Sequence, residues 1–95
     1  MKSIPTIQDF VPVTTIHSIK LEIKSRFRFR RKEQRISQQA LSKRSGVSYG
    51  SIRRFENSGE ISLTSLLKIS QAIGLLEEFN PLFKQPLIKN LKDFK

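Results

Sequence analysis

The stretch Ser37–Glu56, SQQALSKRSGVSYGSIRRFE, decides the fold of this 95-residue chain. It predicts two short helices joined by a tight turn. Ser37 and Ser48 are each placed to cap a helix, because a serine hydroxyl can accept a hydrogen bond from a backbone amide in the first helical turn. Gly46 stands between them, where a helix ends and a positive φ is needed. Two capped helices around one glycine turn are typical of a helix-turn-helix.

Apolar residues give each of these helices an inner face. Four of them fall where the two helices would bury their shared side: Leu41, Val47, Ile52 and Phe55. Ile52 and Phe55 are three positions apart and lie on one stripe of the second helix. Five residues of that helix remain outward: Tyr49, Gly50, Ser51, Arg53 and Arg54. A plain helical hairpin with solvated arginines is the alternative, but the agreement of caps, turn and apolar register favours a pair of helices that reads DNA.

The composition indicates one small basic domain. The chain has no cysteine, so neither disulfides nor a cysteine-bound zinc can supplement a modest core. The formal net charge is +10, and residues 24–35 hold seven basic residues and one glutamate, which implies a polyanionic partner. With no run of about 18 apolar residues and no apolar leader at the N-terminus, we expect a cytoplasmic protein that does not bind membranes.

A first helix is predicted over about residues 15–32. Four apolar residues recur there at spacings of three or four: Ile16, Ile19, Ile23 and Phe27. Residues 26–30 alternate arginine and phenylalanine, a period of two that suits a strand, but the longer window favours the helix. The preceding residues 1–14 contain two prolines and are predicted to form an irregular N-terminal arm.

A fourth helix should follow the central stretch. Residues 57–60 form a turn by composition, and Ser62 can then cap a helix that runs to about Ile73 and ends at Gly74. Its buried side is expected to hold five apolar residues: Leu63, Leu66, Leu67, Ile69 and Ile73.

Residues 75–83 suggest a short fifth helix with Pro81 near its end, so the folded domain is expected over residues 15–83 and a tail over residues 84–95. The tail carries four apolar residues: Leu87, Ile88, Leu91 and Phe94. Because four helices can already bury the central apolar residues, we expect the region from the fifth helix onward to bind protein rather than DNA.

The segment from residue 27 to residue 79 resembles the Cro/CI (XRE) family of helix-turn-helix repressors. The residues that carry the resemblance are Gln38 and Leu41-Ser42 in the second helix, Gly46-Val47-Ser48 at the turn, Ile52, and Phe55-Glu56-Asn57. The resemblance implies a compact, all-α, five-helix lambda-repressor-like domain that binds double-stranded DNA. Ser42 departs from the usual alanine. Gly50 stands where many relatives carry a base-reading side chain, so it either lets the backbone approach DNA or is merely tolerated.

The resemblance also assigns roles to single residues. Gln38 is expected to contact a DNA phosphate and to buttress the recognition helix, and Arg31 to pair with Glu56. Four residues would face the major groove: Tyr49, Gly50, Arg53 and Arg54. Tyr49 could meet a thymine methyl or a base edge, or lie flat on the protein surface. The full predicted DNA-binding set is Ser37, Gln38, Ser48, Tyr49, Gly50, Ser51, Arg53, Arg54 and Asn57.

Phosphate and base contacts would have different effects. Contacts from Ser37, Gln38 and Asn57 to phosphates would fix the register of the protein on the duplex without reading sequence. Arg53 or Arg54 could make a bidentate contact to N7 and O6 of guanine, which does read sequence.

We therefore predict a sequence-specific transcriptional repressor. It should act as a homodimer, because one recognition helix reads too few base pairs for useful selectivity. The alternative is an antitoxin: the overall layout, including residues 79–83, is similar to that of HipB-type antitoxins, which repress their own operon and bind a HipA-like kinase toxin. A membrane or acidic-protein binder that uses residues 24–35 would need Phe27 and Phe29 on one helix face, which their spacing of two opposes.

The sequence offers no catalytic or metal-binding constellation. His17 is the only histidine, so neither a catalytic triad nor a histidine-rich metal site can be assembled around it. Glu77 and Glu78 are adjacent, which points them about 100° apart on a helix and suits a solvated first turn. We predict a protein without enzymatic activity, metal or cofactor.

Overall fold

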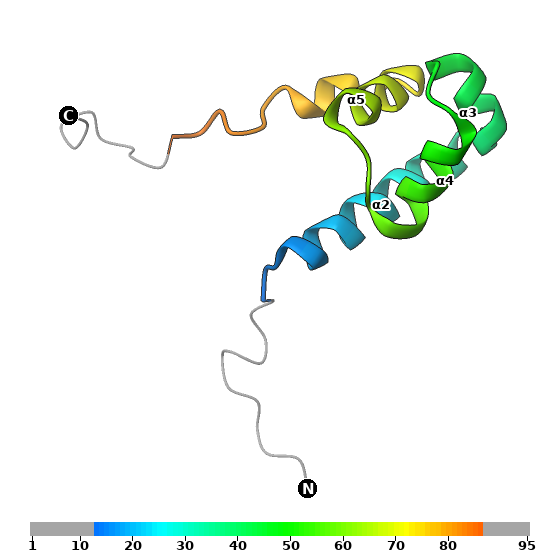
Figure 1. Ribbon diagram of the computed structural model, residues 1–95. Coiled ribbons are helices and arrows are strands. Elements are labelled where there is room, and N and C mark those ends of the chain that lie inside the picture. The colour runs from blue at the N-terminus through cyan, green and yellow to red at the C-terminus, as the bar shows by residue number, and fades with distance from the viewer. Residues whose placement is uncertain (1–12, 87–95) are drawn as a thin grey trace, which may run out of the picture.

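The computed structural model describes residues 13–86. The elements in this range are α2 (Ile16–Glu33), α3 (Gln38–Ser45), α4 (Tyr49–Ser58), α5 (Leu63–Ala72) and the short 3-10 helix η1 (Leu76–Phe79). Figure 1 shows α4 alongside the second half of α2, with α3 at one end of the domain and α5 near η1. The described residues contain no strand, so the all-α prediction is confirmed for them.

Each α-helix begins after a hydroxyl side chain that accepts a hydrogen bond from the amide of the third helical residue. These N-caps are Thr15, Ser37, Ser48 and Ser62. Such a cap is worth about 1 kcal/mol, because it satisfies a donor that the helix itself leaves unpaired. The serine caps predicted from the sequence are confirmed, and they fix where each short helix starts.

Glycines end the two central helices in the left-handed conformation. Gly46 follows α3 with φ of 79° and Gly59 follows α4 with φ of 82°, a region that residues with a Cβ rarely adopt. The first of these turns was predicted. The predicted turn over residues 57–60 was placed too early, because α4 continues through Ser58 before Gly59 stops it.

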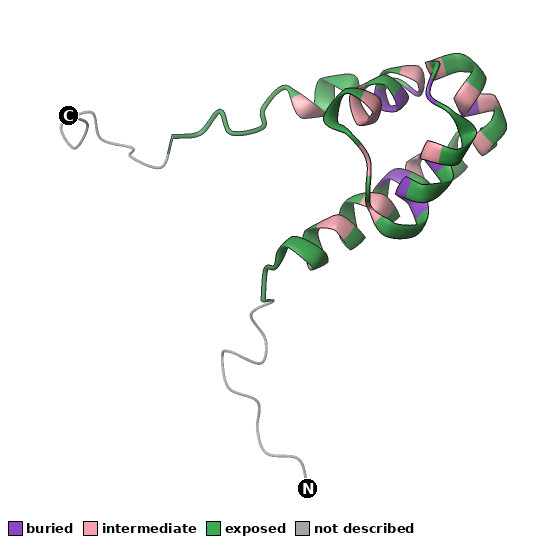
Figure 2. Cartoon of the chain, viewed as in Figure 1, coloured by how far each residue is buried: buried purple, intermediate pink, exposed green. Residues whose placement is uncertain are grey.

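The core lies where α2, α3, α4 and α5 meet (Figure 2). Four apolar side chains in it are at most 1% exposed: Leu41, Ile52, Phe55 and Ile69. The ring of Phe27 from α2 packs edge-on against Phe55, with 5.5 Å between centroids. The four apolar residues predicted to join the two central helices are thus all buried, with Val47 at 5% exposure.

The start of α2 departs from the predicted amphipathic pattern. Of the four residues expected on the buried stripe, only Phe27 is buried; Ile16 is 81% exposed, Ile19 42% and Ile23 39%. In Figure 1 the first turns of α2, which carry Ile16 and Ile19, project beyond the other helices, so these two isoleucines have no core to enter. Ile23 instead lines an apolar groove beside the core residues Phe27 and Leu75. Residues 26–30, which could have formed a strand, are helical.

A similar correction applies to α5. Ile69 and Ile73 are buried, and Leu66 and Leu67 are half-buried, but Leu63 is 67% exposed. Leu63 is the first residue of the helix, and the periodic pattern does not reveal that the core stops short of it.

The predicted fifth helix over residues 75–83 is only the four-residue 3-10 helix η1, so a count of five α-helices is not confirmed. Pro81 explains the early end, because it has no amide to continue the hydrogen bonding beyond Asn80. Leu75, just before η1, is 8% exposed and belongs to the core. Leu75 therefore fills part of the core, contrary to the expectation that the four helices alone would complete it.

Candidate nucleic-acid interface

Helix α4 presents a polar row on the side opposite its core contacts. Ile52, Phe55 and Glu56 are at most 2% exposed. The residues before Ile52 and between Ile52 and Phe55 are exposed or half-exposed, and they are the ones that the sequence assigned to DNA: Tyr49, Gly50, Ser51, Arg53 and Arg54. Because every third or fourth residue is anchored in the core, this row is held on rigid backbone.

Two residues of the row support each other. The guanidinium carbon of Arg53 lies 5.8 Å from the centre of the Tyr49 ring, a cation–π contact between residues four apart. Tyr49 is 38% exposed. The ring therefore lies against a neighbouring arginine of the same helix, which limits the directions that this arginine can take.

Behind the row lies a buried network that ties α2, α3 and α4 together. Nε of Arg31 donates to Glu56 at 2.7 Å and its Nη2 donates to the other carboxylate oxygen at 2.8 Å. Arg31 also donates to the carbonyl of Ile36 at 2.7 Å, and the amide of Gln38 donates to Glu56 at 2.9 Å. The described residues leave no buried side-chain donor or acceptor unpaired.

The turn between α3 and α4 is fixed by Ser42. Its hydroxyl donates to the carbonyl of Val47 at 2.6 Å, which ties the last turn of α3 to the residue just before the cap of α4. Ser42 was identified from the sequence only as a departure from the usual alanine. Its hydrogen bond was missed, because Val47 is an ordinary core residue in the sequence.

Residues 27–79 match the model of the family described as Helix-turn-helix. The match covers more than half of the chain and includes α3, α4 and the turn between them. The chain belongs to this family, of the Cro/CI (XRE) type. Comparisons with curated proteins and with solved structures found no match.

Family membership makes this helix-turn-helix protein a DNA-binding transcription regulator. Such regulators are generally not enzymes. Within residues 13–86, no group of three or more histidine, cysteine, aspartate or glutamate residues could hold a metal ion. No helix in the same range is long and apolar enough to cross a membrane.

The remaining predicted contacts of this helix-turn-helix protein lie at helix ends. The Ser37 hydroxyl accepts from the amide of Ala40 at 3.0 Å, and the Ser48 hydroxyl accepts from the amide of Ser51 at 3.1 Å. Asn57 is exposed in the last turn of α4. Both serines thus serve the helix termini, where free backbone amides and the helix dipole favour an anion such as phosphate.

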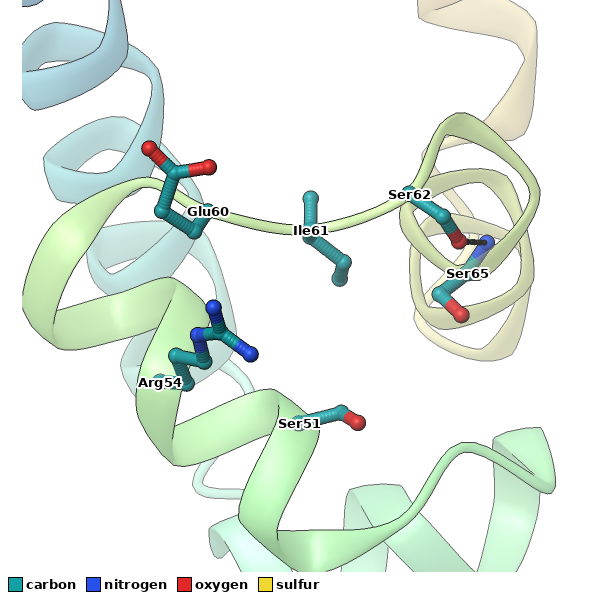
Figure 3. A pocket seen from close by; sticks show the side chains of 6 residues that line it. All are labelled: Ser51, Arg54, Glu60, Ile61, Ser62 and Ser65. Atoms are coloured by element: carbon teal, nitrogen blue, oxygen red, sulfur yellow. Dashed lines mark hydrogen bonds between the residues drawn. The ribbon is translucent and has the colours of Figure 1, made fainter.

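A polar recess of about 310 Å³ opens between α4 and the start of α5 (Figure 3). It is lined by Ser51, Arg54, Glu60, Ile61, Ser62 and Ser65. Glu60 forms an ion pair with Lys20 of α2. This hydrogen bond and the charge of Lys20 lower the pKa of the Glu60 carboxyl, and the charge of Arg54 lowers that pKa further.

Neither Lys20 nor Glu60 was predicted from the sequence to be a site residue. They lie 40 positions apart, and no periodicity within one helix relates them. Only the approach of the α4–α5 loop to α2 brings them together.

Proposed function

We propose that this protein is a sequence-specific transcriptional repressor that inserts α4 into the major groove of DNA. The observation that supports this most is the division of α4 into a buried side and an outward row of polar and basic residues. A helix held in this way can present side chains to base edges in defined positions. The formal net charge of +10 favours a polyanionic ligand.

Within this proposal, Arg53 and Arg54 read bases and the flanking polar residues bind phosphates. An arginine can donate two hydrogen bonds to N7 and O6 of guanine, and this contact discriminates against other bases. Ser37, Gln38 and Asn57 surround the row and would fix its register on the duplex. Gln38 already donates to buried Glu56, so its contact to DNA would be linked to the network behind α4.

Selection from random duplexes tests the proposal. The wild-type protein should enrich a defined sequence, and Arg54→Ala should lose about 1 to 3 kcal/mol on the selected duplex while relaxing preference at one position. Tyr49→Ala should behave similarly. Gln38→Ala should weaken binding to selected and scrambled duplexes alike, because it removes a phosphate contact.

Titrations at one fixed salt concentration are required, because each phosphate contact changes the salt dependence of binding. Lys68→Ala is a suitable control: Lys68 is an exposed residue of α5 that does not belong to the predicted DNA-binding set. Unchanged discrimination in both Arg53→Ala and Arg54→Ala would exclude α4 as the recognition helix.

We further propose that the repressor binds a pseudo-palindromic site as a homodimer. One helix reads only a few base pairs, and a two-fold dimer doubles the site. An apolar groove of about 500 Å³ supports a protein partner; α2, α5, η1 and Leu82 line it, and its residues include Ile23, Phe29 and Leu66. None of the outward residues of α4 lines this groove, so a partner bound there would leave the outward row of α4 accessible to DNA.

The same groove keeps an antitoxin role as a second candidate. An antitoxin must bind a toxin and DNA on different surfaces. A groove that includes none of the outward residues of α4 meets that condition. The two candidates differ in what they bind: a dimer needs only a second copy, whereas an antitoxin needs the HipA-like kinase. A kinase-like gene adjacent to this one, with a stable complex between the two products, would favour the antitoxin.

A further inference from the structure

The first turns of α2 lie outside the family match but contact the loop that follows α4. The match begins at residue 27, whereas α2 begins at Ile16. A Cβ built on Gly59 would lie 2.8 Å from Cβ of Lys20 and 3.0 Å from the Lys20 carbonyl oxygen. The loop therefore runs directly against the backbone of α2. Only a glycine fits there, because φ is 82° and no space remains for a side chain.

Lys20 engages this loop through Glu60. Its ammonium group forms an ion pair with the Glu60 carboxylate, and the lysine side chain is 33% exposed. Glu60 also lines the polar recess that contains Arg54. In Figure 3 the Glu60 carboxylate points away from the Arg54 guanidinium and toward α2.

The Arg54 and Glu60 side chains nevertheless line the same recess, and their charges interact. The positive charge of Arg54 is among the causes that lower the pKa of Glu60, so the two groups lie within electrostatic reach. Among the described residues, the Arg54 side chain makes no hydrogen bond or ion pair. A carboxylate released from Lys20 would therefore have one obvious new partner, and a guanidinium paired with a carboxylate has fewer donors left for DNA.

We propose that Lys20 is a positioning residue for DNA binding: it holds Glu60 against α2 and thereby keeps the Arg54 guanidinium available to DNA. This proposal rests on the proposed function, in which Arg54 contacts DNA. Lys20 acts through Glu60 and not through a phosphate contact of its own. Because an exposed ion pair adds little to folding stability, the effect of Lys20 is on binding.

Three full-length variants test this: Lys20→Met, Glu60→Gln and the double variant. Their dissociation constants are measured on the duplex selected by the wild-type protein, at one salt concentration. Lys20→Met should weaken binding about threefold to fivefold, the upper part of the range expected when one solvent-exposed ion pair competes for a DNA contact. Glu60→Gln should bind as tightly as wild type or more tightly. The double variant should bind within about twofold of Glu60→Gln, because the competing charge is gone.

An additive result would overturn the proposal. If Lys20 contacts a phosphate directly, Lys20→Met will weaken binding by the same factor in the Glu60→Gln protein. Lys24→Met is the matched control, because it removes a charge from the same part of α2, and its effect should not depend on Glu60. Melting curves of all variants should match wild type within about 2 °C, in line with the small stability contribution of exposed pairs.

Failure of this proposal is distinguishable from failure of the proposed function. If Arg54→Ala weakens binding and Lys20→Met does not, the role of Lys20 is wrong and that of α4 stands. If discrimination is unchanged in both Arg53→Ala and Arg54→Ala, the assignment of α4 itself is wrong.

Discussion

At the scale of single residues, the most consequential contact is the ion pair between Arg31 and Glu56. The two side chains are 8% and 2% exposed, so both charges have left water, which is costly unless each is fully paired. Nη1 of Arg31 also donates to the Ile36 carbonyl, and Glu56 also accepts from Gln38. The pair therefore joins α2 to α4, and removing one partner leaves a buried charge.

Glu56→Ala should lower the free energy of unfolding by about 3 to 5 kcal/mol, because it leaves the buried Arg31 guanidinium without its carboxylate. Chemical denaturation monitored by circular dichroism measures this loss. Glu22→Ala is the matched control: Glu22 pairs with Arg26 on the exposed side of α2 and should cost less than about 1 kcal/mol. Equal effects of the two substitutions would show that burial of the Arg31–Glu56 pair contributes nothing.

At the scale of elements, α4 combines a favourable cap with an unfavourable glycine. Gly50 is exposed in the first turn, its φ is not positive, and a Cβ there would meet nothing within 4 Å. Neither backbone conformation nor packing within the protein therefore requires glycine at this position. An approach of the DNA backbone or bases to the first turn of α4 would supply the missing reason.

Gly50→Ala should raise the free energy of unfolding by about 0.5 to 1 kcal/mol, because alanine loses less entropy in a helix. We expect the same substitution to weaken binding to the selected duplex, since the added methyl lies on the row that we propose faces DNA. Gly46→Ala is the contrasting variant: its φ of 79° disfavours alanine, so it should destabilise the fold by about 1 kcal/mol. Unchanged DNA affinity in Gly50→Ala would mean that the glycine is merely tolerated.

An ion pair between Arg30 and Glu78 connects α2 to η1. Arg30 pairs with Glu78 at 2.7 Å, and the hydrogen bond from Arg30 lowers the pKa of the Glu78 carboxyl. Both groups are exposed, so the pair orients η1 more than it stabilises the domain. Together with buried Leu75, it keeps one wall of the apolar groove in place.

At the scale of the whole molecule, we propose that two surfaces of the domain bind partners. The outward row of α4 is proposed to bind DNA, and the apolar groove between α2, α5 and η1 is proposed to bind protein. Phe29 is 63% exposed and Leu82 49% exposed at this groove, which leaves apolar area that a partner can cover. The tail residues predicted to join such an interface, Leu87, Ile88, Leu91 and Phe94, lie outside the described residues.

Phe29→Ser and Leu82→Ser should therefore weaken the proposed homodimer at least about tenfold, because each removes apolar area from its interface. Sedimentation of the full-length variants at micromolar concentration measures the dissociation constant. Leu63→Ser is the matched control, since Leu63 is an exposed leucine outside the groove. A dimer as tight as wild type in both groove variants would contradict this interface, and a monomeric wild type would contradict the dimer.

The sequence by itself determined the central part of this fold. The caps Ser37 and Ser48 and the turn at Gly46 act within a few residues, so spacing alone predicts them. The outward row of α4 follows from the same local logic, because helical periodicity fixes which residues share a face with Ile52 and Phe55. The partnership of Arg31 and Glu56 was reached through family resemblance, since no local pattern relates residues 25 positions apart.

Only the tertiary structure decided the rest. The isoleucines at the start of α2 have the spacing of a buried stripe but lie beyond the core, because periodicity defines a face and not what covers it. The contact of Lys20 with Glu60 and the groove beside η1 arise where segments distant in sequence meet. Their formation depends on how the helices pack, and packing sums many weak contacts that no single segment of the chain encodes.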